Sequence, residues 1–243
     1  VLSCDVYFYD LAVGLGIDKL GDALFAFGFG PPTGIDINGE VSGVVPSREW
    51  KRQQFQRPED KVWFPGETVI AGIGQGYTLT TPLQLAHATA TLAARGERYR
   101  PRLLIATEET FGGGMTYREP DRLPGVEIDA AHWRVVHQGL VDVTQAPRGT
   151  GRTPMLGAEY VVAGKTGTAQ VRGIAQDAKY DAEQIDERHR DHGLFIAYAP
   201  AEAPRIAVAV VIENGGGGAS AAAPVARKIM DAYFASQSGT EGY

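Results

Sequence analysis

The chain has 243 residues, of which 44% are hydrophobic and 21% are charged, so it can bury the core of one large domain or two small ones. Its formal net charge of −6 argues against a nucleic-acid partner, because such partners need a basic face that neutralises phosphates. One cysteine excludes an intrachain disulfide, and no run of about 18 apolar residues could span a membrane.

The N-terminal third of the chain predicts two helices followed by a long irregular stretch. Ser3 can cap a helix over residues 6–13, and a second helix fits residues 17–27, with Gly28 as its C-terminal stop. Residues 28–76 are rich in glycine and proline. Structureless stretches of this length in a compact domain are uncommon and often functional.

The middle of the chain predicts two helices separated by a strand. Thr81 as N-cap and Pro82 at the first helical position begin one helix, which ends at Gly96. Residues 99–107 suit a strand. Asp129 can cap the second helix, whose apolar side would carry Trp133, Val136, Leu140 and Val143.

Strand patterns gather near the C-terminus. After loop-like residues 146–158, strands are expected within residues 160–170, 194–198 and 206–213. An amphipathic closing helix follows over residues 225–234. Because these strands follow one another without intervening helices, we expect an antiparallel sheet in an α+β fold.

The run AGKTGT at residues 163–168 is the sharpest motif, and it has three interpretations. It matches the end of the phosphate-binding loop G-x-x-x-x-G-K-[ST], but Glu159 stands where the opening glycine should be, and its carboxylate would repel phosphate. It also matches the K-T-G of serine acyltransferases that act on β-lactams and D-alanyl peptides. The third interpretation is a strand end with an exposed lysine, since the triplet alone often occurs by chance.

In such acyltransferases the K-T-G triplet lies on a strand that lines the active site. Lys165 would supply positive charge for the substrate carboxylate and help to move protons, and the Thr166 hydroxyl would bind that carboxylate. Gly167 would let the substrate backbone approach closely. Thr168 can present a backbone N–H to the developing oxyanion.

The second element that such enzymes need, S-x-N or a variant, fits Ser3, Cys4 and Asp5. Its serine hydroxyl bridges the nucleophile and the lysine, although a helix N-cap is the simplest interpretation of Ser3, and both can hold together. Asp5 departs from the pattern, because an ionised carboxylate only accepts hydrogen bonds and suits a nearby lysine better than a substrate carbonyl. For Cys4, a small buried side chain is favoured over a metal ligand.

Two other groups of residues could be mistaken for binding sites. His189 and His192 lie among acidic residues, but no third strong ligand is fixed by spacing, so a solvated charged loop is favoured over a metal site. The glycines at 72, 74 and 76 miss the G-x-G-x-x-G spacing of a dinucleotide site.

Five stretches together resemble the monofunctional penicillin-binding transpeptidases: SCDVYFYDLAVGLGIDKL, FGFGPPTGIDINGE, GIGQGYTLTTPLQLAHATATLA, AGKTGTAQV and IAVAVVIENGG. VVPSREWKR and RHRDHGLFIAYAP are similar to the elongation-specific branch of that family. The resemblance implies the α+β fold that these proteins share with serine β-lactamases. Residues 1–243 would form the C-terminal part of one transpeptidase domain, with helices and loops over 1–145 and the sheet strands and closing helix over 146–235.

The resemblance also implies an activity. A serine attacks the D-Ala–D-Ala bond of a peptidoglycan stem peptide, an amine from a neighbouring stem resolves the acyl-enzyme, and β-lactams inhibit covalently. Ser3 and Lys165 would be catalytic, and the substrate would be bound by Asp5, Thr166, Gly167 and Thr168. No cofactor or metal is expected. Membrane proteins of the elongation machinery, such as a glycosyltransferase, would be partners at the periplasmic face of the bacterial inner membrane, where a helix outside this chain would anchor the protein.

The family also needs S-x-x-K, whose serine is the nucleophile and whose lysine is its base, and these 243 residues do not contain it. In the family this motif precedes S-x-N, so we expect it before Val1. The chain alone is therefore expected not to react with penicillin. It should hold an incomplete sheet, with an exposed apolar face and an unpaired edge, and should be poorly stable.

Two alternatives remain open at this point. The first is a D,D-carboxypeptidase or a serine β-lactamase on the same fold, which would release hydrolysed product instead of cross-linking. The second is a non-catalytic partner in the elongation machinery, which a decayed upstream S-x-x-K would favour.

Overall fold

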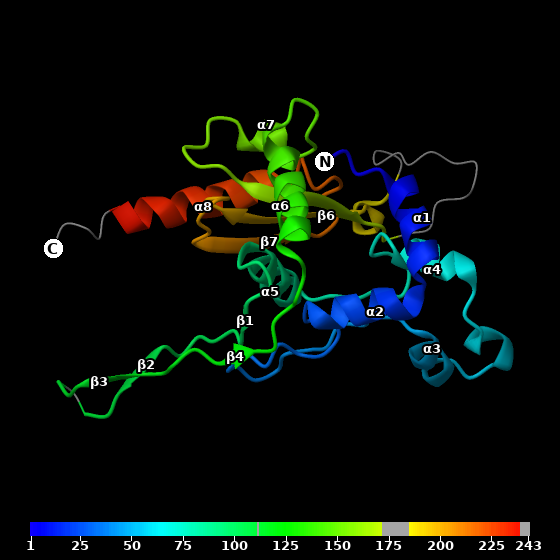
Figure 1. Cartoon of the computed structure of the whole chain (residues 1–243), viewed down its shortest axis with the longest axis horizontal. Coiled ribbons are helices and arrows are strands. Elements are labelled where there is room, and N and C mark those ends of the chain that lie inside the picture. Colours follow the sequence, from blue (N-terminus) through cyan, green and yellow to red (C-terminus); the bar gives the residue numbers. More distant parts are fainter. Residues whose placement is uncertain (111, 172–184, 239–243) are drawn as a thin grey trace.

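The computed structural model describes residues 1–110, 112–171 and 185–238 (Figure 1). Its helices are α1 (Asp5–Leu15), α2 (Ile17–Ala26), α3 (Arg48–Gln54), α4 (Pro65–Ala71), α5 (Pro82–Ala93), α6 (Ala130–Gln145), α7 (Arg152–Met155) and α8 (Ala222–Ser238), with short 3-10 helices η1 (Pro58–Lys61) and η2 (Glu187–His189). Its strands are β1 (Arg98–Tyr99), β2 (Ala106–Glu108), β3 (Met115–Tyr117), β4 (Arg122–Leu123), β5 (Ala163–Ala169), β6 (His192–Ala199) and β7 (Ile206–Ile212).

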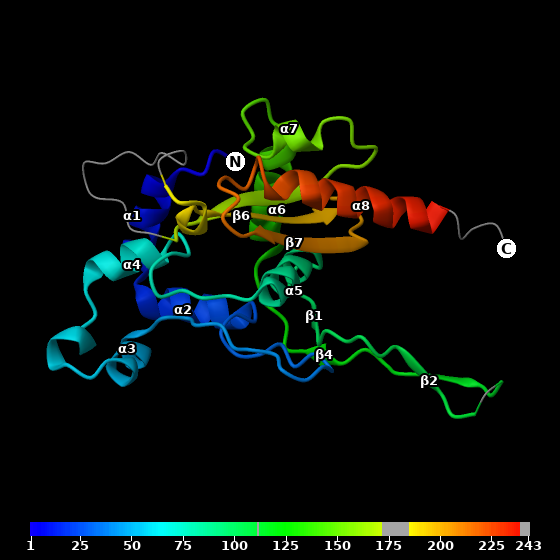
Figure 2. The same cartoon turned by 180° about the vertical axis from the view of Figure 1, so that it is seen from behind.

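The main sheet has three antiparallel strands, with β6 between β5 and β7. α8 packs on β6 and β7, α5 also packs on β6 and β7, and α6 packs on β5. Figures 1 and 2 show the sheet between α8 and the pair α5 and α6. The α+β fold with an antiparallel sheet is therefore confirmed.

Each face of the sheet buries its own core, because successive strand residues point to opposite faces. On the α8 face, Phe195 and Ala197 pack with apolar side chains of β7 and with Met230 of α8. On the other face, Ala163 and Tyr198 pack against residues of α5 and α6. The strand β6 is thus covered on both sides, and it pairs with β5 along residues 163–169.

The predicted helix starts are confirmed at α5 and α6 but not at α1. Thr81 and Gln84 form a capping box at α5, and the Asp129 carboxylate accepts a bond from the N–H of Ala131 at α6. At α1 the N-cap is Cys4, without any side-chain cap bond. The expectation that Ser3 caps this helix is wrong, because its hydroxyl is engaged elsewhere.

The expectation of an irregular stretch over residues 28–76 is partly wrong, because α3, η1 and α4 lie within it. Ser47 caps α3 by accepting a bond from the N–H of Trp50, at 3.0 Å. α4 begins at Pro65, and Glu67 accepts a bond from the backbone N–H of Phe64. Helices of seven residues show no clear periodicity, so only their caps could have indicated them.

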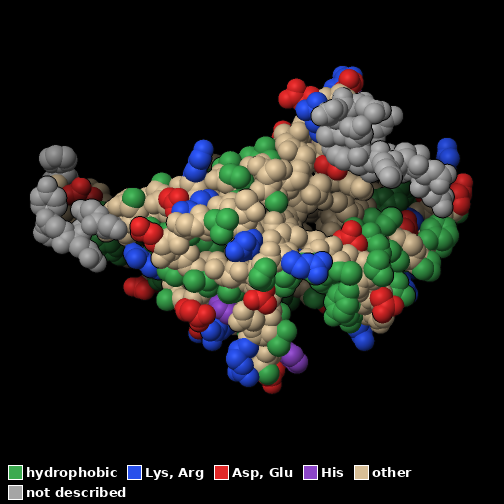
Figure 3. Space-filling model, turned by 90° about the horizontal axis from the view of Figure 1, so that it is seen from above, with side chains coloured by type: hydrophobic (Ala, Val, Ile, Leu, Met, Phe, Trp, Pro, Cys, Tyr) green, Lys and Arg blue, Asp and Glu red, His purple; other side chains and the backbone are tan. Residues whose placement is uncertain are grey.

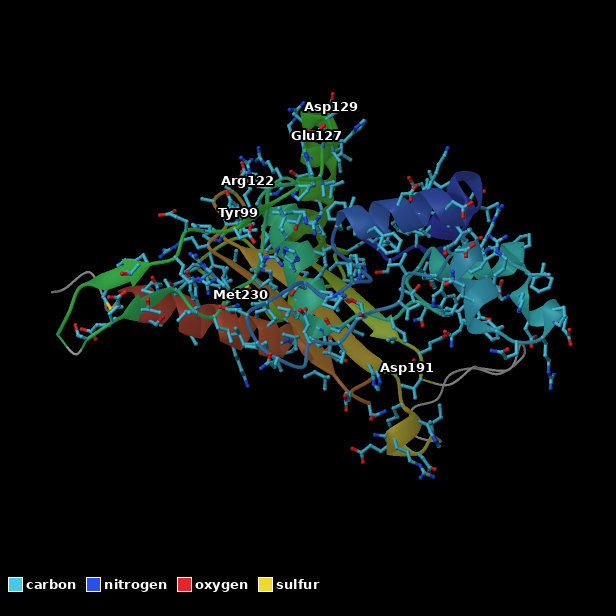
Figure 4. All side chains as sticks on the ribbon, turned by 90° about the horizontal axis from the view of Figure 1, so that it is seen from below. Tyr99, Arg122, Glu127, Asp129, Asp191 and Met230 are labelled. Carbon is cyan, nitrogen blue, oxygen red and sulfur yellow. The ribbon has the colours of Figure 1, made fainter. Side chains whose placement is uncertain are left out.

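An extended arm carries β1 to β4 away from the sheet (Figures 1 and 2). At its base β1 pairs with β4, and Figure 4 shows the partners Tyr99 and Arg122 there. The predicted strand over residues 99–107 is divided into β1 and β2. Between them the N–H groups of Leu103 and Leu104 donate to the Asp36 carboxylate, so the ladder is interrupted at these two residues. The expected loop over residues 146–158 likewise contains the short helix α7.

Several apolar surfaces are exposed. Figure 3 shows hydrophobic side chains gathered at the end of the molecule that holds α1 to α4. α1 contributes to them, with Val6 74% and Tyr7 63% exposed. In the described residues β7 pairs on one side only, with β6. The open edge of β7 agrees with the expectation, whereas the exposed apolar side chains named here belong to α1, and helices pack on both faces of the described sheet. The low stability stays a prediction. Among the same residues, no helix is long and apolar enough to cross a membrane.

Candidate active site

A cleft of about 590 Å³ lies between the start of α1, the connection from α4 to α5, and β5. Its lining includes all six residues that the sequence predicts for the site: Ser3, Asp5, Lys165, Thr166, Gly167 and Thr168. Gly72, Ile73 and Gln75 from the α4–α5 connection line the same cleft. The fold therefore brings together two sequence motifs that lie about 160 residues apart.

The centre of the cleft is a contact between the two motifs. The Lys165 ammonium donates to the Ser3 hydroxyl oxygen at 2.7 Å and to the Thr166 carbonyl at 2.6 Å. Ser3 has φ of 49°, in the left-handed region that non-glycine residues rarely occupy. Such strained residues cluster at functional sites, where the surroundings hold them in place. Here the lysine holds the serine hydroxyl over the cleft.

Two opposing effects act on the charge of Lys165. Burial lowers the pKa of its ammonium below the usual value, while the negative charge of Asp5 raises that pKa. Burial is the larger effect, so the net shift is downward. Asp5 therefore supports the charged form of the lysine, in agreement with the sequence-based expectation that this carboxylate suits a nearby lysine.

Replacing Asp5 by asparagine is expected to lower the pKa of Lys165 further, because the change removes the charge that favours the ammonium. The lysine then loses its proton at a lower pH than in the unaltered chain. NMR titration of the labelled lysine side chain measures this midpoint. Asp10→Asn, an exposed position on the same helix, is the matched control and should leave the midpoint in place. An unchanged midpoint in Asp5→Asn would contradict the electrostatic coupling.

The hydroxyl of Thr166 has a partner that the sequence did not reveal. Its Oγ1 lies 3.0 Å from Oγ1 of Thr150. Thr150 belongs to the stretch expected to be a loop, so periodicity and motifs gave no signal for it. Its hydroxyl orients that of Thr166, which lies 3.5 Å from the Lys165 ammonium. The cleft thus presents the Lys165 ammonium and the Thr166 hydroxyl, a pair that can bind a carboxylate.

Within the part of the chain that the structure describes, β5 pairs on one side only, with β6, and its other edge, here called the open edge, borders the cleft. Pairs in an antiparallel ladder alternate, so the N–H and C=O of every second residue point away from the neighbouring strand. The carbonyls of Thr166 and Thr168 accept bonds from Lys165 and from the Gln75 side chain, so both point away from β6. The N–H of Thr168 must then lie on the same open edge, where it can donate to a carbonyl oxygen or an oxyanion in the cleft.

Gly167 is closely packed on its β6 side. A Cβ atom there would meet the Cβ of Leu194 at 3.2 Å. Gly218 also lies against this pair, since a Cβ on Gly218 would overlap the backbone oxygens of both Gly167 and Leu194. The turn around Gly218 therefore supports the last residue of the K-T-G motif. The expected role of Gly167, close approach by a substrate backbone, stays a prediction.

Replacing Gly218 by alanine is expected to destabilise the protein by about 1–3 kcal/mol, because the new methyl forces the backbone of β5 and β6 apart. Thermal unfolding measures the effect. Gly139→Ala is the matched control, since no atom lies within 4 Å of its added Cβ in α6. That change should raise stability by up to about 1 kcal/mol, because alanine favours the helix. Equal effects of the two substitutions would disprove the role of Gly218.

The histidines and the cysteine do not gather at this cleft. His192 accepts a bond on Nδ1 from the N–H of Asn214, and His189 lies 3.9 Å from Asp186. Figure 4 shows Asp191 next to η2, just before β6 begins. Across residues 1–110, 112–171 and 185–238, no three His, Cys, Asp or Glu side chains come together as a metal site.

The expectation that Cys4 is buried is wrong, because its side chain is exposed at the start of α1.

Comparison with known proteins finds a consistent set of relatives. Residues 1–231 match the penicillin binding protein transpeptidase domain. The chain is 43% identical over 233 residues to the peptidoglycan D,D-transpeptidase MrdA of Haemophilus influenzae, which covers 95% of this chain but only 35% of that protein. The chain therefore spans little more than a third of the length of this curated relative.

Solved structures agree with this result. The Pseudomonas aeruginosa PBP2 in complex with WCK 5153 is 44% identical, with a TM-score of 0.77, over 94% of this chain and 46% of the other. The Helicobacter pylori PBP2 in its complex with MreC is 28% identical, also with a TM-score of 0.77, over 96% of this chain and 38% of the other. Sequence and fold thus point to one family.

Proposed function

Since the chain belongs to the penicillin-binding protein transpeptidase family, we propose that it forms the C-terminal part of the catalytic domain of an elongation-specific D,D-transpeptidase. The observation that carries the proposal is the 2.7 Å bond between Lys165 and Ser3 in a cleft lined by the open edge of β5. The nucleophilic serine would come from upstream residues. We call the chain together with these residues the extended protein.

The reaction follows from the groups in the cleft. The serine Oγ attacks the carbonyl carbon of the D-Ala–D-Ala bond, the C–N bond breaks, and the terminal D-alanine leaves with the proton. Ser3 and Lys165 relay that proton, while the ammonium and the hydroxyl of Thr166 hold the terminal carboxylate. The N–H of Thr168 stabilises the oxyanion. An amine of a second stem peptide then attacks the ester, the C–O bond breaks, and the serine regains its proton.

Partners and location are further parts of the proposal. The P. aeruginosa PBP2 binds WCK 5153, and the H. pylori PBP2 forms a complex with MreC. The match to the penicillin binding protein family supports a reaction of the extended protein with β-lactams. By likeness to the H. pylori complex, it would join the membrane proteins of the elongation machinery, including a glycosyltransferase. It would act at the periplasmic face of the inner membrane, held there by an anchor outside the chain. The groups described in the cleft require no cofactor.

The test is the fate of the acyl-enzyme in the extended protein. With a stem pentapeptide as donor, we expect release of D-alanine together with a cross-linked product when an amine acceptor is present. Release of hydrolysed peptide regardless of the acceptor would indicate a carboxypeptidase. Rapid turnover of penicillin would indicate a β-lactamase, and no reaction with either substrate would leave the non-catalytic alternative.

A further inference from the structure

A residue outside the motifs occupies the open edge of β5. Gln75 donates from its side-chain Nε2 to the backbone carbonyl of Thr168 at 2.9 Å, across 93 positions of sequence. The Gln75 side chain is partly exposed and lines the cleft. Thr168 offers a peptide partner two backbone groups, its N–H donor and its C=O acceptor. The Gln75 side chain therefore already occupies the acceptor.

A peptide that pairs with the open edge of β5 would need both halves of that site. Paired residues of an antiparallel ladder exchange two bonds, so a residue opposite Thr168 accepts from its N–H and donates to its C=O. Suppose that the reacting carbonyl of a substrate accepts a bond from the N–H of Thr168. The backbone N–H of that same substrate residue then lies where it can donate to the carbonyl of Thr168. Gln75 holds that position in this structure.

We propose that Gln75 is a specificity-determining residue, whose side-chain amide stands in for the substrate's backbone N–H on Thr168 and is displaced by it. The inference rests on the proposed function. A ligand that carries an N–H beside its reacting carbonyl exchanges one bond for another. A ligand without that N–H leaves Gln75 in place, so the carbonyl of Thr168 stays paired.

The local backbone allows the side chain to move alone. A Schellman turn closes α4, with bonds from the N–H of Gln75 to the carbonyl of Ile70 and from Gly74 to Ala71. Gly74 and Gly76 have φ of 77° and 72°, a conformation that glycine adopts without strain. The backbone at Gln75 is thus fixed, and only the side-chain torsions must change when the amide leaves Thr168.

The experiment measures acylation of the extended protein by two β-lactams. One is benzylpenicillin, whose acylamino N–H lies beside the reacting carbonyl, and the other is a penam carboxylate without that group. In Gln75→Met, which keeps the length but not the donor, we expect acylation by benzylpenicillin to become about 2- to 10-fold more efficient, because no bond is lost on binding. Acylation by the second compound should become slower or stay the same. The ratio of acylation efficiency with benzylpenicillin to that with the second compound therefore rises.

Other results would overturn the inference. An equal loss with both compounds would mean that Gln75 merely positions β5, and no change in the ratio would mean that it has no part in recognition. Gln53→Met, an exposed glutamine on α3, is the matched control and should change neither rate. Gln75→Ala repeats the test should the methionine obstruct the cleft. If the unaltered extended protein forms no acyl-enzyme, the proposed function fails, and this inference fails with it.

Discussion

Replacing Lys165 by methionine is expected to slow acylation of the extended protein by penicillin at least about 100-fold. The ammonium touches both the Ser3 hydroxyl and the Thr166 side chain, so its loss removes the proton relay and the charge that binds the carboxylate. Losing a positioned acid–base group alone costs about 10²- to 10⁴-fold. Stopped-flow measurement of the acylation rate constant tests this.

The control for Lys165 is Lys228→Met, an exposed lysine on α8, which should acylate at the unaltered rate. Thermal unfolding of both variants must also be compared, because a loss of fold would imitate a loss of catalysis. If Lys165→Met acylated within about threefold of the unaltered protein while folded, the assignment of the catalytic lysine would be wrong.

Replacing Lys51 by methionine is expected to destabilise the protein by about 3–5 kcal/mol, because it leaves the carboxylate of Glu67 without its partner in a poorly hydrated site. The side chains of Lys51 and Glu67 are only 3% and 19% exposed, and they form an ion pair. Burial is the largest single effect and would raise the pKa of Glu67, but the hydrogen bond and charge of Lys51, together with hydrogen bonds from the Phe64 N–H and the Tyr77 side chain, outweigh it, so the pKa is lowered.

The surroundings of Lys51 explain the size of this effect. The Lys51 ammonium also donates to the carbonyl of Val62 at 2.7 Å, and it lies 5.1–5.9 Å from the ring centres of four aromatic side chains, Phe55, Trp63, Phe64 and Tyr77. It therefore ties α3 to α4, the helix that precedes the connection carrying Gln75. Removing it should loosen that whole segment.

The matched control is Arg52→Met, which breaks an ion pair with Glu49 whose side chains are 61% and 65% exposed. Exposed pairs contribute about 0–1 kcal/mol, so this change should be nearly neutral. Denaturant unfolding of the extended protein compares the two. A loss of less than about 1 kcal/mol in Lys51→Met would show that the ion pair does not organise this segment.

The parts of the site that sequence predicts are those carried by contiguous motifs. The K-T-G run and Ser3 could be assigned because each chemical role needs a particular residue type at a fixed spacing, and β5 then places them in one cleft. The α+β fold followed from strands that succeed one another without helices. Both are properties of short windows of sequence.

The remaining parts depend on contacts between distant segments. Thr150 and Gln75 sit in irregular connections, and only the folded chain brings them to Thr166 and Thr168. For Ser3 only the capping role was wrong: a serine before a helix is a natural cap, but a bond from Lys165, 162 residues away, holds its hydroxyl, as the S-x-N motif predicts.

The most direct test of the central claim is labelling with fluorescent penicillin, applied in parallel to this chain and to the extended protein. We expect the extended protein to be labelled with one penicillin per molecule and the 243-residue chain not to be labelled. Stable stoichiometric labelling of the chain alone would contradict the proposal that the nucleophile lies upstream. A folded extended protein that takes no label would contradict the transpeptidase function, and Ser3 and Lys165 would lose their assigned roles.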